Sequence, residues 1–211
     1  MPSAPTLLAF SAAAAALVLL PGPNLLYIIS RGIAQGRRAA LASTLGVTAA
    51  TAVFVVLTAF GLTALISSSV VAFSVVKYAG VAYLVYLAVR EFRSHGRFRL
   101  EQPPPVSSRR AFADAFVVGI TNPKVALFFL AFFPQFVHAD AGPVTTQVLV
   151  LGAVFVAIGL TFDSTYALAS GAIGGWLAGR PRVMSRSHYV SGAVYLALGG
   201  AALLTDSTRR T

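Results

Sequence analysis

Three ionisable residues interrupt the long apolar stretches of this chain and are the side chains best placed to do chemistry: Lys77, Lys124 and Asp163. A charged side chain inside a hydrocarbon layer costs about 2.5–3.5 kcal/mol, so each of them needs a physical reason. Asp163 can bind an ammonium group, carry a proton or act as the structural partner of a lysine. Lys124 can bind a carboxylate, whereas Lys77 can extend its ammonium group to the edge of the apolar layer. Asp114, near the start of another apolar stretch, is a second candidate for proton coupling.

Two breaks lie within apolar stretches at corresponding places in the two halves of the chain. The first is Pro21-Gly22-Pro23-Asn24 and the second is Thr121-Asn122-Pro123-Lys124. Proline lacks a backbone N–H donor and glycine loosens the backbone, so both interrupt a helix. In a bilayer the freed carbonyl groups need partners, and such a break persists only where it is buried in protein or lines a wet cavity. Paired, interrupted spans indicate a transport site.

Each break leaves a half-helix that begins inside the apolar layer, at about Pro23 and about Pro123. A helix N-terminus presents unpaired N–H donors and about half a positive charge, and proline suits its first position. Two such ends facing each other favour an anion such as a carboxylate. We therefore predict a substrate site, without a catalytic residue or a metal ion, at these residues: Pro21, Gly22, Pro23, Asn24, Asn122, Pro123, Lys124 and Asp163. The alternative is that each break is only a kink accommodated by helix packing.

The composition predicts which elements position these residues. Of 211 residues, 57% are hydrophobic and only 10% are charged, whereas soluble domains carry about 25% charged residues. We therefore predict an all-α membrane protein whose main partner is the lipid bilayer. Since a spanning helix needs about 20 apolar residues, six transmembrane helices are expected, at about 5–29, 39–66, 70–89, 111–137, 144–169 and 189–204. The glycine-rich segment after the fifth span, 171–179, is expected at the membrane surface.

The charges of the loops predict the orientation of these helices. The first, third and fifth loops contain three, six and three arginines, whereas the second and fourth contain no Lys or Arg. Because cytoplasmic loops carry the excess of positive charge, both termini are expected to be external. Each half has three spans, which is an odd number, so the second half enters the membrane from the opposite face to the first. The two halves would therefore be inverted repeats. A single membrane domain, 1–211, would then contain two three-helix repeats, 1–92 and 111–211, joined by a cytoplasmic linker, 93–110, with the first helix of each repeat broken.

Other features of the sequence narrow the classes of function. The net charge of +10 does not indicate nucleic acid binding, because the positive residues cluster between apolar runs. The absence of cysteine excludes disulfides and thiolate metal sites, and the three histidines are scattered. No nucleophile–base pair or phosphate-binding loop stands out, so neither an enzyme nor a cofactor is expected. Small residues at helix-packing spacing, Ala42, Gly46 and Ala50, favour close helix contacts and are compatible with a homodimer.

Several blocks of the sequence resemble one family of membrane proteins. The segment Pro21-Gly22-Pro23-Asn24, followed by Gly32, Gly36 and Gly46, resembles the N-terminal signature of the lysine exporter (LysE/RhtB) family of amino-acid and homoserine-lactone efflux proteins. The segment 77–84, KYAGVAYL, resembles the third span of that family. The segment 119–124 with Phe128-Phe129 and Phe133-Pro134-Gln135-Phe136 resembles its fourth span. The likeness extends from about residue 5 to 204 and is weakest after Tyr166.

The resemblance implies an exporter of amino acids or their derivatives in the bacterial inner membrane, driven by a proton or ion gradient. Together with the residues above, it predicts a secondary-active exporter that holds the substrate carboxylate near Asn24, Asn122 and Lys124. Asp163 would hold the substrate ammonium or carry the coupling proton. One alternative is an intramembrane enzyme acting on a lipid or small metabolite. Another is a channel or an exporter of a different solute such as a metal ion. The lack of cysteine and the scarcity of intramembrane carboxylates argue against metal transport.

Overall fold

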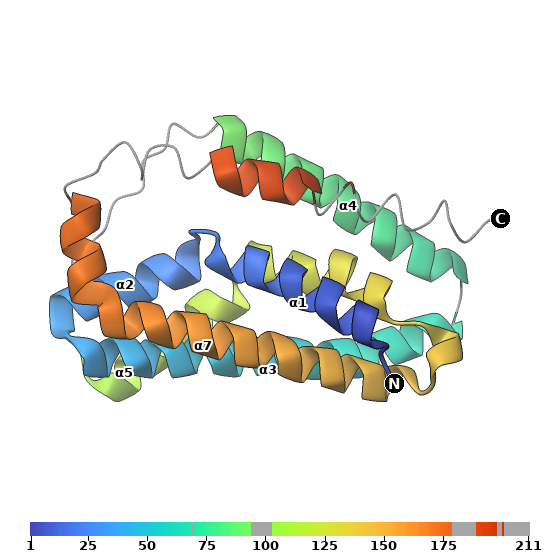
Figure 1. The fold of residues 1–211 in the computed structure, drawn as a ribbon, viewed down its shortest axis with the longest axis horizontal. Coiled ribbons are helices and arrows are strands. Elements are labelled where there is room, and N and C mark those ends of the chain that lie inside the picture. Colours follow the sequence, from blue (N-terminus) through green and yellow to red (C-terminus); the bar gives the residue numbers. More distant parts are fainter. Residues whose placement is uncertain (69, 94–102, 179–188, 198–199, 201–211) are drawn as a thin grey trace.

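All regular secondary structure in the described part of the chain is helical (Figure 1). The structure is a computed structural model that describes residues 1–68, 70–93, 103–178, 189–197 and 200. Its labelled α-helices are α1 (Ala4–Leu19), α2 (Pro23–Gln35), α3 (Arg37–Ser68), α4 (Val70–Arg93), α5 (Ser108–Ile120), α6 (Pro123–Leu127) and α7 (Val144–Ala178). Residues 189–197 are also helical. Between α6 and α7 lie a π-helical turn, η1 (Phe128–Phe132), and two 3-10 turns, η2 (Phe133–Phe136) and η3 (Ala139–Ala141).

Two of the described helices are long and apolar enough to cross a membrane by themselves, within α3 at Arg37–Gly61 and within α7 at Val144–Ile173. Two further spans result if each bent pair of helices counts as one. These pairs are Ala4–Leu19 with Pro23–Gln35, bent by 52°, and Ser108–Ile120 with Pro123–Phe136, bent by 46°. The prediction of an all-helical chain with helices that can span a membrane is therefore confirmed for the described residues. The sixth predicted span, 189–204, lies partly outside the described residues, and the inverted repeat stays a prediction.

Both helix breaks lie where the prolines and glycine predicted them. The first helix ends at Leu19, and the N–H of Leu20 still donates to Leu17 O at 3.3 Å. The chain is then extended through Gly22 until Pro23 occupies the first position of α2. At the second break α5 ends at Ile120, and Pro123 likewise opens α6. Since proline needs no N–H partner in the first turn of a helix, each break restarts cleanly.

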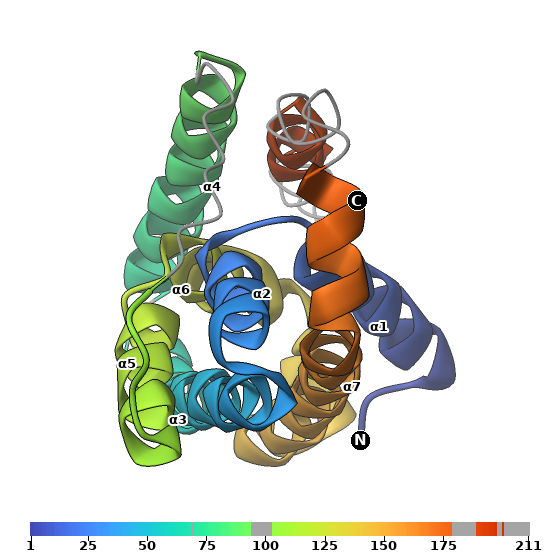
Figure 2. The same ribbon diagram turned by 90° about the vertical axis from the view of Figure 1, so that its left-hand side faces the viewer.

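Helix α3 packs against α2, α5 and α7 and lies between α5 and α7 in the lower part of Figure 2, while α4 stands at one edge. Glycines allow the closest of these contacts. A Cβ added to Gly46 of α3 would lie 2.9 Å from Ala115 Cβ of α5, and one added to Gly119 would lie 2.7 Å from Ala50 Cβ. Gly46 and Ala50 of the second predicted span are therefore packing residues within the chain, as their spacing indicated.

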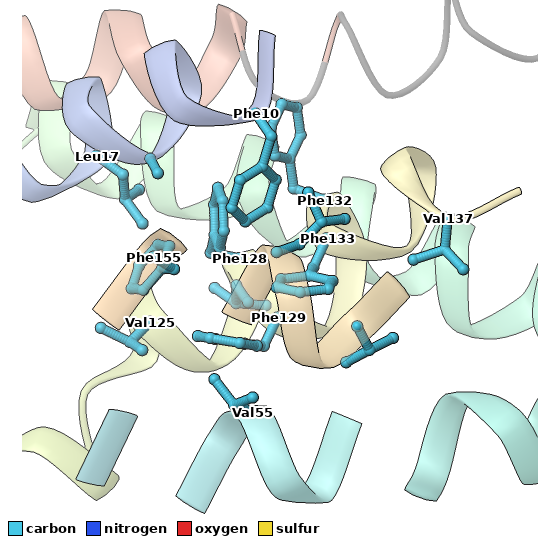
Figure 3. Close-up of a cluster of buried hydrophobic side chains, with 14 of the residues drawn as sticks. Phe10, Leu17, Val55, Val125, Phe128, Phe129, Phe132, Phe133, Val137 and Phe155 are labelled. Atoms are coloured by element: carbon cyan, nitrogen blue, oxygen red, sulfur yellow. The ribbon is translucent and has the colours of Figure 1, made fainter. Parts of the chain in front are cut away.

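A cluster of buried phenylalanines joins α1 to the turns η1 and η2, which follow α6, and to α7 (Figure 3). The ring centroid of Phe10 lies 5.1 Å from that of Phe133, and the ring of Phe128 lies 4.9 Å from that of Phe155. Aromatic pairs of this kind contribute about 0.5–1.5 kcal/mol beyond their buried area. They fix the two broken helices against each other on one side of the breaks.

Two predicted boundaries are wrong. The loop expected to begin at Arg31 begins after Gln35, where Gly36 adopts a positive φ of 82° before α3 starts at Arg37. The glycine-rich segment expected to follow the fifth span continues α7 as far as Ala178. Glycine costs only about 1 kcal/mol in a helix, and the next proline in the chain is Pro181. The alanines, leucine and other helix-compatible residues between these glycines therefore suffice to continue the helix.

Candidate functional site

The two breaks meet through their asparagines, both of which are buried. Nδ2 of Asn122 donates a hydrogen bond of 2.8 Å to Oδ1 of Asn24. The other end of the Asn122 amide caps its own helix, because Oδ1 accepts from the backbone N–H of Lys124 at 3.0 Å. One side chain thus closes the start of α6 and ties it to the start of α2.

The Lys124 ammonium group crosses to the other broken helix. Its Nζ donates to Leu17 O and to Leu20 O, both at 3.0 Å, and the side chain is buried. The last carbonyl groups of a helix lack intrahelical partners and lie at the negative end of its dipole. The start of α6 disfavours a cation, but the end of α1 compensates by supplying two acceptors. An ammonium group has three donors, so one N–H of Lys124 is not used by these two bonds.

Gly22 gives Lys124 the room for this position. A Cβ added at Gly22 would lie 3.2 Å from Lys124 Nζ and 3.5 Å from its Cε. The backbone of Gly22, with φ −163° and ψ 179°, is extended and open to any residue, so space is what glycine provides. No side chain caps the N-terminus of α2, and the first N–H groups of that helix remain donors without intrahelical partners.

A small cavity lies beside the breaks, with a volume of about 30 Å³. This volume holds one or two water molecules and is far below the roughly 300–1,000 Å³ of typical ligand pockets. The cavity as it stands is therefore too small for an amino acid. Four helices and the end of α1 line the cavity, through Leu17, Val18, Asn24, Leu25, Val47, Thr51, Lys124, Val125, Phe155, Gly159 and Asp163.

Asp163 faces Lys124 across this cavity as the opposite charge. It is 7% exposed, on α7. Only its backbone carbonyl is engaged, by the Thr44 hydroxyl at 3.3 Å. Among the described residues no hydrogen bond reaches the Asp163 carboxylate, and no ion pair within 4.0 Å does so either. A buried carboxylate without such a partner is costly.

Asp114 lies apart from the cavity, in a second polar cluster on α5. Its carboxylate pairs with Arg110 Nε at 2.8 Å and with Arg31 Nη2 at 3.5 Å. Arg31 is buried on α2 and also donates to Tyr27 Oη at 2.9 Å and to Pro104 O at 2.9 Å. This cluster joins α2 to α5 and to the segment that precedes α5.

The sequence analysis placed Arg31 in a loop and so missed its buried role. The signal available was the spacing of Tyr27, Arg31 and Gln35, which puts the three on one helix face. Gln35 Oε1 accepts from Arg31 Nη1 at 2.8 Å, and its Nε2 donates to Val106 O at 2.8 Å. The side chain of Lys77, the third ionisable candidate, lies outside the described residues.

Comparisons with known proteins give one family model and several relatives. The family model described as LysE type translocator matches residues 15–207. The chain is 33% identical over 192 residues to a homoserine/homoserine lactone efflux protein of Salmonella typhimurium, covering 90% of this chain and 91% of that protein. It is 30% identical over 195 residues to an uncharacterized membrane protein of Vibrio cholerae, covering 91% and 93%. It is also 33% identical over 129 residues to a leucine efflux protein of Salmonella choleraesuis, covering 59% and 60%. No solved structure matches the chain.

Proposed function

Because the chain belongs to the LysE type translocator family, we propose that it exports amino acids or amino-acid derivatives across the bacterial inner membrane by secondary active transport. The relatives with described functions are efflux proteins, so the chain is a transporter and not an enzyme. The intramembrane enzyme considered from the sequence is thereby set aside. Substrate, coupling and orientation are the parts that the proposal adds.

One observation carries the proposal: a buried cation and a buried, unpartnered anion line the same cavity at the meeting point of two helix breaks. An amino acid presents the complementary pair, a carboxylate and an ammonium group. The carboxylate would accept from the unused N–H of Lys124 and from the N-terminal donors of α2 near Asn24. The ammonium group would lie at Asp163. Asn122 would hold the two breaks in register rather than contact the substrate.

A cavity of this size must widen to hold an amino acid, and we propose that the protein does so by alternating between two open forms. We propose that the six predicted spans form two inverted repeats and that movement of the half-helices opens the site to one face at a time. The arginine-rich loops would be cytoplasmic and both termini external. The bonds of Arg31 to Asp114 and to Pro104 would then close the cytoplasmic side. A homodimer remains a separate prediction, since the small residues of α3 are occupied by contacts within the chain.

Coupling to a proton or ion gradient has two candidate residues. Asp163 either holds the substrate ammonium or carries the coupling proton, because it lies in the cavity without a partner. Asp114 is the second candidate, but it lies outside the cavity and pairs with two arginines. Asp163 is therefore the better placed of the two.

The test is Asp163→Asn in purified protein reconstituted into liposomes loaded with a panel of labelled amino acids. We expect efflux driven by a proton gradient to disappear. Exchange of labelled for unlabelled substrate across the membrane without a gradient separates the roles. Retained exchange assigns Asp163 to the proton, whereas loss of both assigns it to the substrate ammonium. A variant that inserts normally and exports at the wild-type rate would refute the site.

A further inference from the structure

The cavity contains one positive and one negative group among the described residues that line it, Lys124 and Asp163. The rest of its lining is apolar apart from the amide of Asn24 and the hydroxyl of Thr51. In the proposed function, the two charges bind the carboxylate and the ammonium group of the substrate. No opposite charge then remains for a charged substrate side chain, and burying an unpaired charge is strongly disfavoured. The cavity therefore suits an uncharged side chain.

Helix α7 presents Phe155, Gly159 and Asp163 to the cavity. Residues four apart lie on the same face of a helix, separated by about 6 Å along its axis. A Cβ added to Gly159 would meet no atom within 4 Å. By contrast, a Cβ added to Gly152 on the same helix would overlap the side chain of Val55 on α3. Gly152 is therefore a packing glycine, whereas the missing side chain of Gly159 leaves open space next to the cavity.

We propose that Gly159 determines how large a substrate side chain the site accepts. This inference rests on the proposed function and names its substrate class as uncharged amino acids. A substrate with its ammonium group at Asp163 would direct its side chain one helical turn along α7, into the space beside Gly159. Phe155 and Val47 would form the apolar wall that surrounds it. A larger residue at position 159 fills this space and excludes long side chains before short ones.

The test measures efflux of labelled alanine, leucine and lysine from liposomes that contain the full chain, Gly159→Ala or Gly159→Val. Because one methylene group in a tight pocket changes selectivity by about 10- to 200-fold, we expect Gly159→Val to lower the leucine-to-alanine efflux ratio at least about tenfold. Gly159→Ala should lower the ratio less, and lysine should not be exported. The matched control is Gly171→Ala, since Gly171 also lies on α7 with no atom within 4 Å of an added Cβ but does not line the cavity. Its ratio should equal that of the wild type.

The outcomes separate this inference from the proposed function. Export by both Gly159 variants with an unchanged leucine-to-alanine ratio overturns the inference and leaves the proposed function standing. Lysine efflux at the rate of leucine overturns the charge argument in the same way. No efflux of any amino acid by the wild-type protein overturns the proposed function itself. If Gly159→Val fails to insert, judged by its yield in membranes, the ratio measured for Gly159→Ala decides.

Discussion

The two charges of the cavity should be coupled in stability as well as in transport, which a double-mutant cycle can measure. Lys124→Met keeps the length of the side chain but removes its charge and both bonds to Leu17 O and Leu20 O. It also leaves Asp163 buried with no positive partner across the cavity. Removing one member of a buried charge pair costs about 3–5 kcal/mol. For a protein of this size, that corresponds to a melting temperature about 6–20 °C lower.

Adding Asp163→Asn to Lys124→Met should recover part of this loss, because it removes the uncompensated charge. No ion pair within 4.0 Å joins the two groups, so their attraction stays below about 4 kcal/mol at an effective dielectric constant of 20. A coupling energy of about 1–3 kcal/mol is therefore expected, so the loss in the double variant should be about 2–12 °C smaller than the sum of the losses in the two single variants. Export should remain absent in both single variants and in the double variant.

The assay pairs thermal unfolding in detergent, followed by size-exclusion chromatography, with efflux from liposomes. Arg110→Gln is the control for removing a cation. The side chain of Arg110, which pairs with Asp114, is largely exposed, and exposed ion pairs contribute only about 0–1 kcal/mol to stability. Losses in Lys124→Met and Asp163→Asn that simply add up in the double variant would show that the two charges are not coupled. Wild-type export by Lys124→Met would refute the assignment of Lys124 to the site.

Two further predictions concern the break itself. Gly22→Ala should reduce efflux with only a small change in melting temperature, because the new Cβ would lie 3.2 Å from Lys124 Nζ and shifts the ammonium group slightly without breaking its bonds to the two carbonyls. Efflux at the wild-type rate would contradict this. Asn122→Ala should destabilise the protein by about 1–3.5 kcal/mol, since it removes a helix cap and the bond between the breaks. Asn24→Ala removes only the bond between the breaks and should cost less in the same thermal assay, so an equal or larger loss would contradict the role of Asn122 as a cap.

The local structure at the breaks was predictable because it depends on residue types with strong backbone preferences. Proline and glycine determined where α1 and α5 stop and where α2 and α6 begin. Apolar length indicated the long helices, although the extent of α2 and α7 was underestimated. These properties belong to short stretches of sequence, and a single chain is enough to read them.

The partners of the site residues were not predictable in the same way. Lys124 is bonded to the carbonyls of Leu17 and Leu20, and any residue in that position would offer the same backbone oxygen. No side-chain pattern in the first half of the chain could therefore have marked them. Asp114 was grouped with Asp163 as an acid near the apolar layer, but tertiary structure places it with Arg31 outside the cavity. Which carboxylate is paired and which is free depends on helix packing.

Side chains of the second break donate hydrogen bonds to acceptors of the first break, so neither half of the chain can complete the site alone. The first half supplies the acceptors at the end of α1 and the amide of Asn24. The second half supplies the cation, the capping amide of Asn122 and the carboxylate of Asp163. If α1 alone moved, Lys124 would lose two charge-assisted bonds, each worth about 1.5–3 kcal/mol. Opening of the cavity should therefore move the end of α1 and the start of α6 together, with α2 and α7 shifting against this pair.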